Sequence, residues 1–162
     1  MIEIKKAELS QLDRLMEIEE KTFLPEEQAK REMYQYRMEH QPFWFRSAKV
    51  GGQVAGFLCG RPVSVKEGEG VRDEFYQAVE IPEGDTFALL SINVDPEYQR
   101  QGIGELMMRT IIFLCREYGM KRIILACKAE RVNYYTKFGF AESGTSESGL
   151  GGSVWYDMEL KL

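Results

Sequence analysis

The sequence has little histidine, little cysteine and no excess of positive charge. One histidine, His40, and three widely separated cysteines give neither a zinc-ligand spacing nor a disulfide framework. No apolar run approaches the length that spans a membrane, and the first residues do not form a signal peptide. The formal net charge of −5 argues against broad nucleic-acid binding, which needs a basic face. We therefore expect a cytoplasmic protein with no metal, nucleic-acid or membrane partner.

The rest of the composition is that of an ordinary globular protein. Of 162 residues, 44% are hydrophobic and 29% are charged, which is typical of soluble domains. A chain of this length can bury one core, so residues 1–162 are expected to form a single domain. Cys59, Cys115 and Cys127 lie in apolar surroundings, which favours buried, unreactive thiols.

A glycine-containing turn joins an apolar strand at 87–94 to a helical pattern at 102–118. The first turn of a helix has backbone N–H groups without intrahelical partners, and these bind anions. Glycine at 102 and 104 removes side chains that would keep a phosphate away from the backbone. The expected anion contacts are the backbone N–H groups of Arg100, Gln101, Gly102, Ile103, Gly104 and Glu105.

The residues around these glycines argue against two other kinds of phosphate-binding loop. Met107 stands where a dinucleotide fingerprint needs its third glycine, and no Gly-Lys-Ser/Thr of a Walker loop is present. The pattern Gln99-x-x-Gly102-x-Gly104 resembles the coenzyme A pyrophosphate loop of the GNAT acyltransferase superfamily. The segment 133–140, Asn-Tyr-Tyr-Thr-Lys-Phe-Gly-Phe, resembles the later motif of that superfamily. Its Tyr135 lies 33 residues after Gly102, which is enough chain for a helix, a strand and a second helix start.

Hydrophobic periodicity predicts the same class of fold, a mixed α/β sheet with helices on both faces. Strands are expected at 2–5, 42–48, 53–60, 87–94, 121–127, 140–146 and 154–160. Helices are expected at 10–19, 25–37, 102–118 and 130–138, with a short one at 71–79 inside the polar, irregular stretch 62–84. A connection as long as 62–84 can act as a lid or simply form an excursion.

The resemblance implies acetyl-CoA as cosubstrate. It implies that the central strands splay apart, so that free backbone groups of Ile92, Asn93 and Val94 hold the pantetheine arm. It also implies a β-bulge near Asn93, where a backbone N–H would meet the thioester carbonyl. Asn133 is a second candidate contact for the arm.

Tyr135 stands where the superfamily keeps its general acid, and the resemblance implies that it protonates the leaving thiolate. A phenol with an ordinary pKa of about 10 is protonated at neutral pH and can donate. The alternative is that Tyr135 only packs in the core. The neighbouring Tyr134 is expected to face elsewhere, into the core.

The sequence does not identify the group that deprotonates the amine. A primary amine with a pKa of about 10.4 is almost wholly protonated at neutral pH, so some group must accept its proton. His40 ends a helical pattern and is expected at the surface. The acidic cluster Glu17, Glu19, Glu20, Glu26 and Glu27 is typical of a solvated face, although a member could meet an amine. One hypothesis is a water chain that ends on Glu26, Glu27 or Asp73.

Within the superfamily, the chain after about Phe43 looks most like arylalkylamine (serotonin-type) N-acetyltransferases and their bacterial relatives. The animal enzymes carry two histidines on the central strand, and Ala88 and Leu90 occupy those positions here. This difference puts the base and an arylalkylamine substrate in doubt. Candidates for an apolar acceptor pocket, each of which could equally belong to the core, are Phe23, Leu24, Tyr34, Phe43, Trp44 and Trp155.

The leading hypothesis is therefore an acetyl-CoA-dependent N-acetyltransferase that acts on a small-molecule primary amine. The first alternative is a peptide or protein N-terminal acetyltransferase of the ribosomal-protein type, which needs an open groove. The second is a non-catalytic acyl-CoA sensor, in which Tyr135 would be dispensable. Many proteins of this superfamily dimerise, so a homodimer is possible.

Overall fold

The computed structural model describes all residues from 1 to 162 and contains one seven-stranded sheet. The strand order is β1-β2-β3-β4-β5-β7-β6, in which only β4 and β5 pair in parallel. The fold is the predicted mixed α/β sheet. The strands are β1 (Ile2–Lys6), β2 (Phe45–Val50), β3 (Gln53–Val63), β4 (Thr86–Val94), β5 (Arg122–Cys127), β6 (Ala141–Thr145) and β7 (Tyr156–Lys161).

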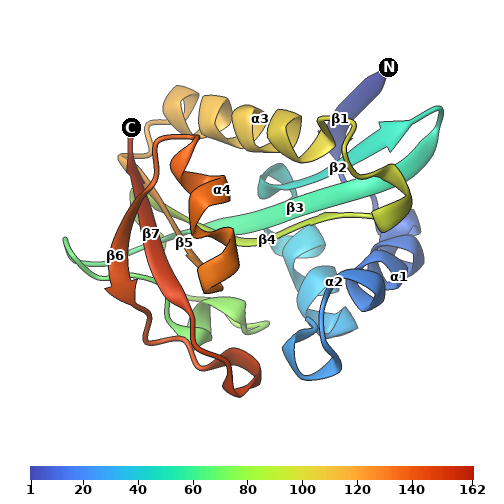
Figure 1. Ribbon diagram of the computed structural model, residues 1–162. Coiled ribbons are helices and arrows are strands. Elements are labelled where there is room, and N and C mark those ends of the chain that lie inside the picture. The colour runs from blue at the N-terminus through green and yellow to red at the C-terminus, as the bar shows by residue number, and fades with distance from the viewer.

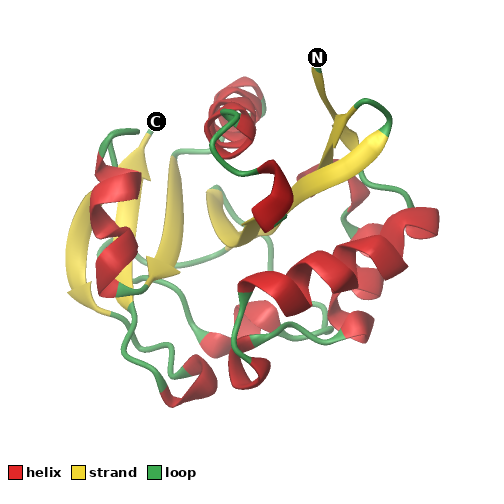
Figure 2. Ribbon diagram, turned by 45° about the vertical axis from the view of Figure 1, so that its right-hand side comes forward, coloured by secondary structure: helices red, strands yellow, loops and turns green.

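Helices cover both faces of the sheet, as Figures 1 and 2 show. They are α1 (Leu12–Thr22), α2 (Arg31–His40), α3 (Ile103–Glu117) and α4 (Val132–Thr136). α3 lies on one face over the largest core cluster, whereas α1 and α2 pack on the other face. No helix combines the length and apolar character that crossing a membrane requires.

The central strands β4 and β5 pair over only three residues and then separate. Thr86, Phe87 and Ala88 are paired with β5, and β4 from residue 89 onward has no partner on that side. This divergence confirms the predicted splay of the central strands. It leaves backbone groups of β4 free along one edge, in the middle of the molecule.

A β-bulge interrupts the pairing of β3 with β4. Cys59 is opposite Ser91 whereas Gly60 is opposite Leu89, so Leu90 is the extra residue. The prediction of a bulge near Asn93 is therefore wrong in position. The bulge lies three residues earlier, where β4 parts from β5.

The bulge changes which face each later side chain of β4 occupies. Leu89 belongs to the core cluster under α3, and Ile92 and Val94 pack against the same cluster. Strict alternation would put 91 and 93 on that face. Instead Ser91 and Asn93 face the other side, where they are hydrogen-bonded to side chains of α2 and α1.

The predicted helix at 25–37 is wrong in its first part. Pro25–Glu27 form a 3₁₀ turn, and Gln28 is extended with ψ of 138°. The N–H of Ala29 donates to the carboxylate of Glu19 at 2.9 Å. A side-chain acceptor on α1 thus takes the backbone donor, and α2 begins only at Arg31.

Three other boundaries differ from the prediction. The first helix, predicted from residue 10, is preceded by a 3₁₀ turn, Leu9–Gln11, in which Glu8 and Gln11 form a capping box, and α1 begins at Leu12. Pro42–Trp44 form a 3₁₀ turn instead of the start of β2. The short helix predicted at 71–79 is reduced to the 3₁₀ turn Asp73–Tyr76.

β3 also extends into the stretch that was predicted to be irregular. It continues through Pro62 to Val63, paired with β4. The pairing of β2 with β3 ends at Phe45 and Cys59, so β3 has a free edge at Pro62. A proline without an N–H is tolerated at such an edge.

Candidate active site

A cleft of about 1330 Å³ opens where β4 and β5 diverge. Its walls come from both strands, the start of α3, the connection between α1 and α2, the region of α4, and residues 73–78. Gln101 and Asn133, both predicted contacts, are exposed and do not line it. The predicted site residues that do line it are Ile92, Asn93, Val94, Arg100, Gly102, Ile103, Gly104, Glu105 and Tyr135.

The loop before α3 presents a row of free backbone N–H groups. Arg100 has φ of 65° and is the only non-glycine residue with positive φ, and Gly102 has φ of 81°. The first backbone hydrogen bond of the helix runs from Leu106 N to Gly102 O. The N–H groups of residues 100–105 donate to no acceptor within the protein. Such a concave row at a helix N-terminus suits a phosphate group.

The two glycines of this loop serve different purposes. A Cβ on Gly102 would meet nothing within 4 Å, so this position faces open space that a ligand can enter. Its positive φ of 81° independently favours glycine. A Cβ on Gly104 would lie 3.0 Å from Tyr134 Oη. Gly104 therefore makes room for a side chain of the protein.

The prediction that Tyr134 faces elsewhere is wrong, because Tyr134 lines the cleft. Its ring packs edge-on against Tyr135, with centroids 5.2 Å apart, and against Phe138 at 5.4 Å. Consecutive residues of a helix are only about 100° apart, so both tyrosines reach the same cavity.

Tyr135 is 9% exposed and packs against Phe140. Burial, with a smaller contribution from the nearby Cys127, raises the pKa of its phenol well above the ordinary value. The phenol is therefore protonated throughout the neutral range. It is a proton donor at the wall of the cleft.

The acidic cluster divides into two groups. Glu17, Glu20 and Glu26 are exposed, as predicted. Glu19 and Glu27 are only 2% and 3% exposed, and both line the cleft. The solvated-face interpretation is wrong for these two.

Glu27 connects three segments. One carboxylate oxygen, Oε1, is paired with Lys128 Nζ and accepts from Ser153 Oγ at 3.1 Å. The other, Oε2, is buried and has no hydrogen-bond partner. A buried acceptor in a cleft wall without a donor is a candidate contact for a ligand N–H.

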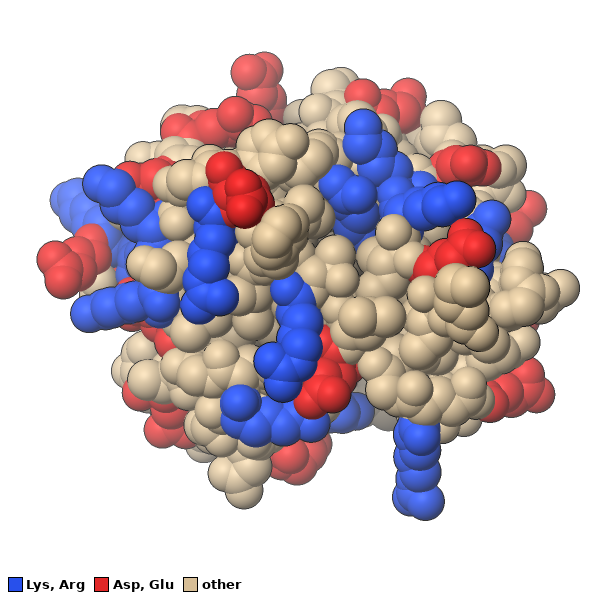
Figure 3. All heavy atoms as spheres, turned by 90° about the horizontal axis from the view of Figure 1, so that it is seen from above, with Lys and Arg blue, Asp and Glu red and all other residues tan.

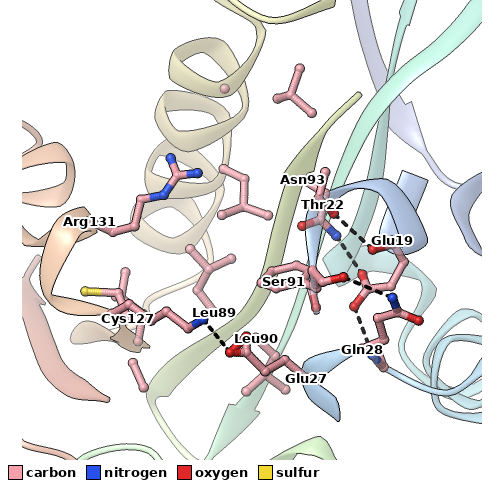
Figure 4. Close-up of a pocket in the computed structure, with 18 of the residues that line it drawn as sticks. Glu19, Thr22, Glu27, Gln28, Leu89, Leu90, Ser91, Asn93, Cys127 and Arg131 are labelled. Carbon is pink, nitrogen blue, oxygen red and sulfur yellow. Dashed lines mark hydrogen bonds and ion pairs between the residues drawn. The ribbon is translucent and has the colours of Figure 1, made fainter. Parts of the chain in front are cut away.

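Glu19 lies beside Asn93 in the cleft wall (Figure 4) and accepts three hydrogen bonds. Its Oε1 accepts from Tyr34 Oη at 2.6 Å and from Asn93 Nδ2 at 2.8 Å. Its Oε2 accepts from Ala29 N at 2.9 Å. Burial raises the pKa of this carboxyl, and these hydrogen bonds oppose the rise. No periodic pattern in the sequence relates positions 19, 34 and 93, so their contact could not be predicted.

The remaining candidates fall into two sets. Phe23, Leu24 and Trp155 line the cleft. Tyr34, Phe43 and Trp44 do not: Tyr34 and Trp44 are buried in the core, and Phe43 packs on Tyr118. His40 is exposed and stacked on Tyr36, as predicted.

Neither position that holds a histidine in the animal arylalkylamine enzymes supplies a base here. Ala88 is fully buried in the sheet core, and Leu90 is the bulged residue. An acidic or hydroxyl group must therefore accept the proton if the site transfers an acyl group to an amine.

Cations gather at one end of the cleft despite the negative net charge. Arg100, Arg131 and Lys137 line it beside the free N–H groups. Figure 3 shows Lys and Arg side chains grouped on the face that carries α3. Glu19 and Glu27 lie across the cleft from Arg131 (Figure 4) and form its acidic side, where Lys128 is paired with Glu27.

The splayed strands, the anion-binding loop and the buried phenol define a site of the acyl-CoA-binding class. The chain belongs to the acetyltransferase (GNAT) family, whose model matches residues 12–140. This confirms the predicted superfamily. The arylalkylamine subgroup stays a prediction.

Individual relatives are distant. A segment of 51 residues is 37% identical to glucosamine 6-phosphate N-acetyltransferase of Schizosaccharomyces pombe and covers 32% of this chain but less than half, 46%, of that protein. The loading GNATL domain of CurA from Lyngbya majuscula superposes with a TM-score of 0.84 at 12% identity, over 99% of this chain and 98% of that one. The ribosomal-protein-S18-alanine N-acetyltransferase of Escherichia coli gives 0.72 at 20% identity, over 99% and 94%. At these identities the structural matches show the fold alone.

Proposed function

We propose that this protein transfers the acetyl group of acetyl-CoA to a primary amine of a small molecule, by direct attack in a ternary complex. The observation that carries the proposal is the continuity of one cleft. It runs from the free N–H groups of the loop, along the unpaired edge of β4, to the phenol of Tyr135.

The coenzyme is held by backbone groups. The pyrophosphate binds the N–H groups of residues 100–105, with Arg100 and Arg131 nearby. The pantetheine arm pairs with the free edge of β4 at Ile92, Asn93 and Val94, which no β5 residue occupies. Asn133 stays a sequence prediction for this role, because its exposed side chain lies outside the cleft.

The reaction needs one proton donor and one proton acceptor. The amine nitrogen attacks the thioester carbon, the C–N bond forms, and the C–S bond breaks as the tetrahedral adduct collapses. The coenzyme thiolate takes the phenol proton of Tyr135, and the nitrogen loses its own proton to an acceptor on the acidic side of the cleft. General acid catalysis of this kind contributes about 10²–10⁴-fold.

Two observations favour a small, cationic acceptor. The turns Pro25–Glu27 and Leu150–Gly152 lie side by side (Figures 1 and 2), and a Cβ on Gly151 would lie 2.6 Å from Glu27 Cγ. Because Glu27 and Leu150 line the cleft, the contact between these turns narrows it on its acidic side. The free Oε2 of Glu27 can accept a hydrogen bond from an ammonium group there.

A peptide acceptor is the alternative. The structurally similar E. coli enzyme is named for the alanine of a ribosomal protein, and an extended peptide would need those two turns to separate. A coenzyme sensor without turnover is the second alternative. A cytoplasmic location, a homodimer and an arylalkylamine substrate stay predictions from the sequence.

The test is thiol release from acetyl-CoA with arylalkylamines, polyamines, amino sugars, amino acids and short peptides. We expect turnover with a small amine, reduced about 10²-fold or more in Tyr135→Phe with little change in KM for acetyl-CoA. Tyr118→Phe, a 60% exposed tyrosine away from the cleft, is the matched control. Turnover with peptides alone would establish the first alternative, and coenzyme binding without turnover the second. Absence of coenzyme binding would overturn all three.

A further inference from the structure

Three side chains from three different elements form one hydrogen-bonded chain that begins in the cleft. Ser91 Oγ on β4 is 2.9 Å from Tyr34 Oη on α2, and Tyr34 Oη is 2.6 Å from Glu19 Oε1 on α1. Ser91 lines the cleft and follows the bulged Leu90 directly. Tyr34 and Glu19 are 1% and 2% exposed. The chain thus runs from Ser91 through Tyr34, which does not line the cleft, to Glu19, and Figure 4 shows the two end members, Ser91 and Glu19, in the cleft wall.

The direction of each hydrogen bond follows from the number of available protons. The other two partners of Glu19, Asn93 Nδ2 and Ala29 N, can only donate. With Glu19 ionised, its Oε1 can only accept, so the single proton of Tyr34 points to Glu19. Tyr34 Oη must then accept from Ser91, whose hydroxyl is the donor. Beside the thiol of Cys59, which is opposite it in the sheet, Ser91 Oγ keeps a lone pair for a donor in the cleft.

We infer that Ser91, Tyr34 and Glu19 are a proton relay that deprotonates the attacking amine. This inference rests on the proposed function and names the acceptor that the sequence did not identify. Ser91 touches the substrate nitrogen, and the other two residues act through it. Water can join the nitrogen to Ser91 without changing the relay.

The proton balance is complete within these groups. The extra proton of the ammonium form of the amine passes to Ser91 Oγ as the Ser91 proton passes to Tyr34 Oη, which leaves the amine neutral for attack. The Tyr34 proton passes to Glu19 in the same movement. The carboxylate becomes a carboxylic acid, both hydroxyls are neutral again, and neither a tyrosinate nor an alkoxide has to accumulate. After product release, Glu19 returns its proton to solvent by the reverse path.

The surroundings favour a carboxylate that can take a proton. The groups that face Glu19 are Tyr34 on α2, Asn93 on β4 and the N–H of Ala29. None of these three is a cation. Cys59 on β3 lies beside Ser91 and Tyr34, and the nearest buried cation, Arg37 on α2, acts on Cys59. Burial raises the pKa of Glu19 toward that of the amine, which makes proton transfer from the amine to Glu19 less unfavourable. Cys59 is a neutral thiol, because burial raises its pKa to about 11.

The test is the pH dependence of kcat/KM in Ser91→Ala, Tyr34→Phe and Glu19→Gln, with the amine that the wild type acetylates fastest. Each variant interrupts the relay, so we expect a loss of about 10²-fold at pH 7 with KM for acetyl-CoA nearly unchanged. The loss should shrink steadily as pH approaches the amine pKa of about 10, where the amine arrives without its ammonium proton. A purely structural defect would not vary with pH in this way.

Matched controls exist for each residue. Ser47→Ala removes a buried serine hydroxyl on β2, Tyr36→Phe a tyrosine hydroxyl on α2, and Glu20→Gln an exposed carboxylate on α1, none of which lines the cleft. All three should keep wild-type profiles. If Glu19→Gln does not fold, Tyr34→Phe and Ser91→Ala still test the relay, because each removes only one hydroxyl oxygen and keeps the rest of the side chain.

The outcomes separate this inference from the proposed function. Wild-type turnover with a deficit that is the same at every pH, or full activity in Ser91→Ala or Tyr34→Phe, overturns the relay and leaves the acetyltransferase intact. No wild-type turnover with any amine overturns both. A deficit that disappears at high pH in all three variants supports both.

Discussion

Arg14 and Asp95 are joined across the fold, with Arg14 Nη2 2.6 Å from Asp95 Oδ2. Asp95 is fully buried at the end of β4, and its Oδ1 accepts from the N–H of Glu97 at 3.0 Å. Burial alone would raise the pKa of Asp95. The Glu97 N–H and the Arg14 guanidinium outweigh burial and hold it below its usual value. The pair ties α1 to the segment that leads into the anion-binding loop.

Asp95→Asn should lower the free energy of unfolding by about 3 kcal/mol at pH 7, because it leaves Arg14 and Lys21 without their buried partner. Since the folded pKa is lowered, the stabilisation is present above the unfolded pKa of about 3.9 and is lost as pH falls through the folded pKa. In urea unfolding, the difference in free energy of unfolding between variant and wild type should therefore become smaller at acid pH. Asp13→Asn, at an exposed ion pair, is the control. A difference in unfolding free energy that is constant with pH would contradict a lowered pKa for Asp95.

Gly102→Ala should weaken acetyl-CoA binding by about tenfold or more. Positive φ of 81° strains an alanine by about 1–2 kcal/mol, and its methyl group would occupy the space that faces the phosphate. Gly68→Ala is the matched control, because Gly68 has φ of 85°, equally open space and no part in the cleft. Calorimetric titration with acetyl-CoA should separate the two. Equal affinities would show that no phosphate approaches Gly102.

Gly151→Ala should weaken the use of the acceptor amine and leave the use of acetyl-CoA unchanged. Its Cβ would lie 2.6 Å from Glu27 Cγ and 3.1 Å from Glu26 O, so the two turns that narrow the acidic side of the cleft must separate. A displacement of about 1 Å can reduce activity by about 10²-fold, and we expect a raised KM for the amine with KM for acetyl-CoA within about twofold. Gly152→Ala has similar φ and open space, and should be nearly silent. Improved use of a peptide by Gly151→Ala would identify these turns as the barrier to larger acceptors.

The cysteines should be inert in the folded protein. Burial raises the pKa of Cys59 and Cys127 to about 11 and that of Cys115 to about 12, so about 0.1% or less of each thiol is ionised at pH 8. A thiol reagent should label none of them within the time that labels all three in urea. Rapid labelling of Cys127 in the native protein would show that the cleft opens around it. The inert thiols also allow coenzyme release to be followed with the same reagent.

The architecture could be predicted from the sequence because strong local patterns determine it. The apolar run at 87–94, the glycines at 102 and 104 and the segment 133–140 each indicate their structure within a few residues. The splay of β4 from β5 and the free N–H groups before α3 were anticipated from the resemblance, and the geometry agrees.

The acidic side of the cleft could not be predicted in the same way. Glu19 is sequence-adjacent to Glu20, and only the packing of α1 against α2 and β4 makes one of them buried and the other exposed. The break at Gln28 depends on Glu19 taking the Ala29 N–H, a contact over ten residues. The bulge at Leu90 depends on pairing with a strand about thirty residues away.

That bulge makes the pairing register of β4 a functional quantity. If Leu90 were paired in a regular ladder, Ile92 and Val94 would turn toward the polar groups of α1 and α2, and Ser91 and Asn93 would enter the apolar layer beneath α3. Deleting Leu90 itself would straighten the strand and leave those four side chains on their present faces, because Ser91 is already opposite Cys59 and Leu89 opposite Gly60. The proton-handling side of this site therefore depends on how β4 is paired with β3 as much as on which residues β4 contains.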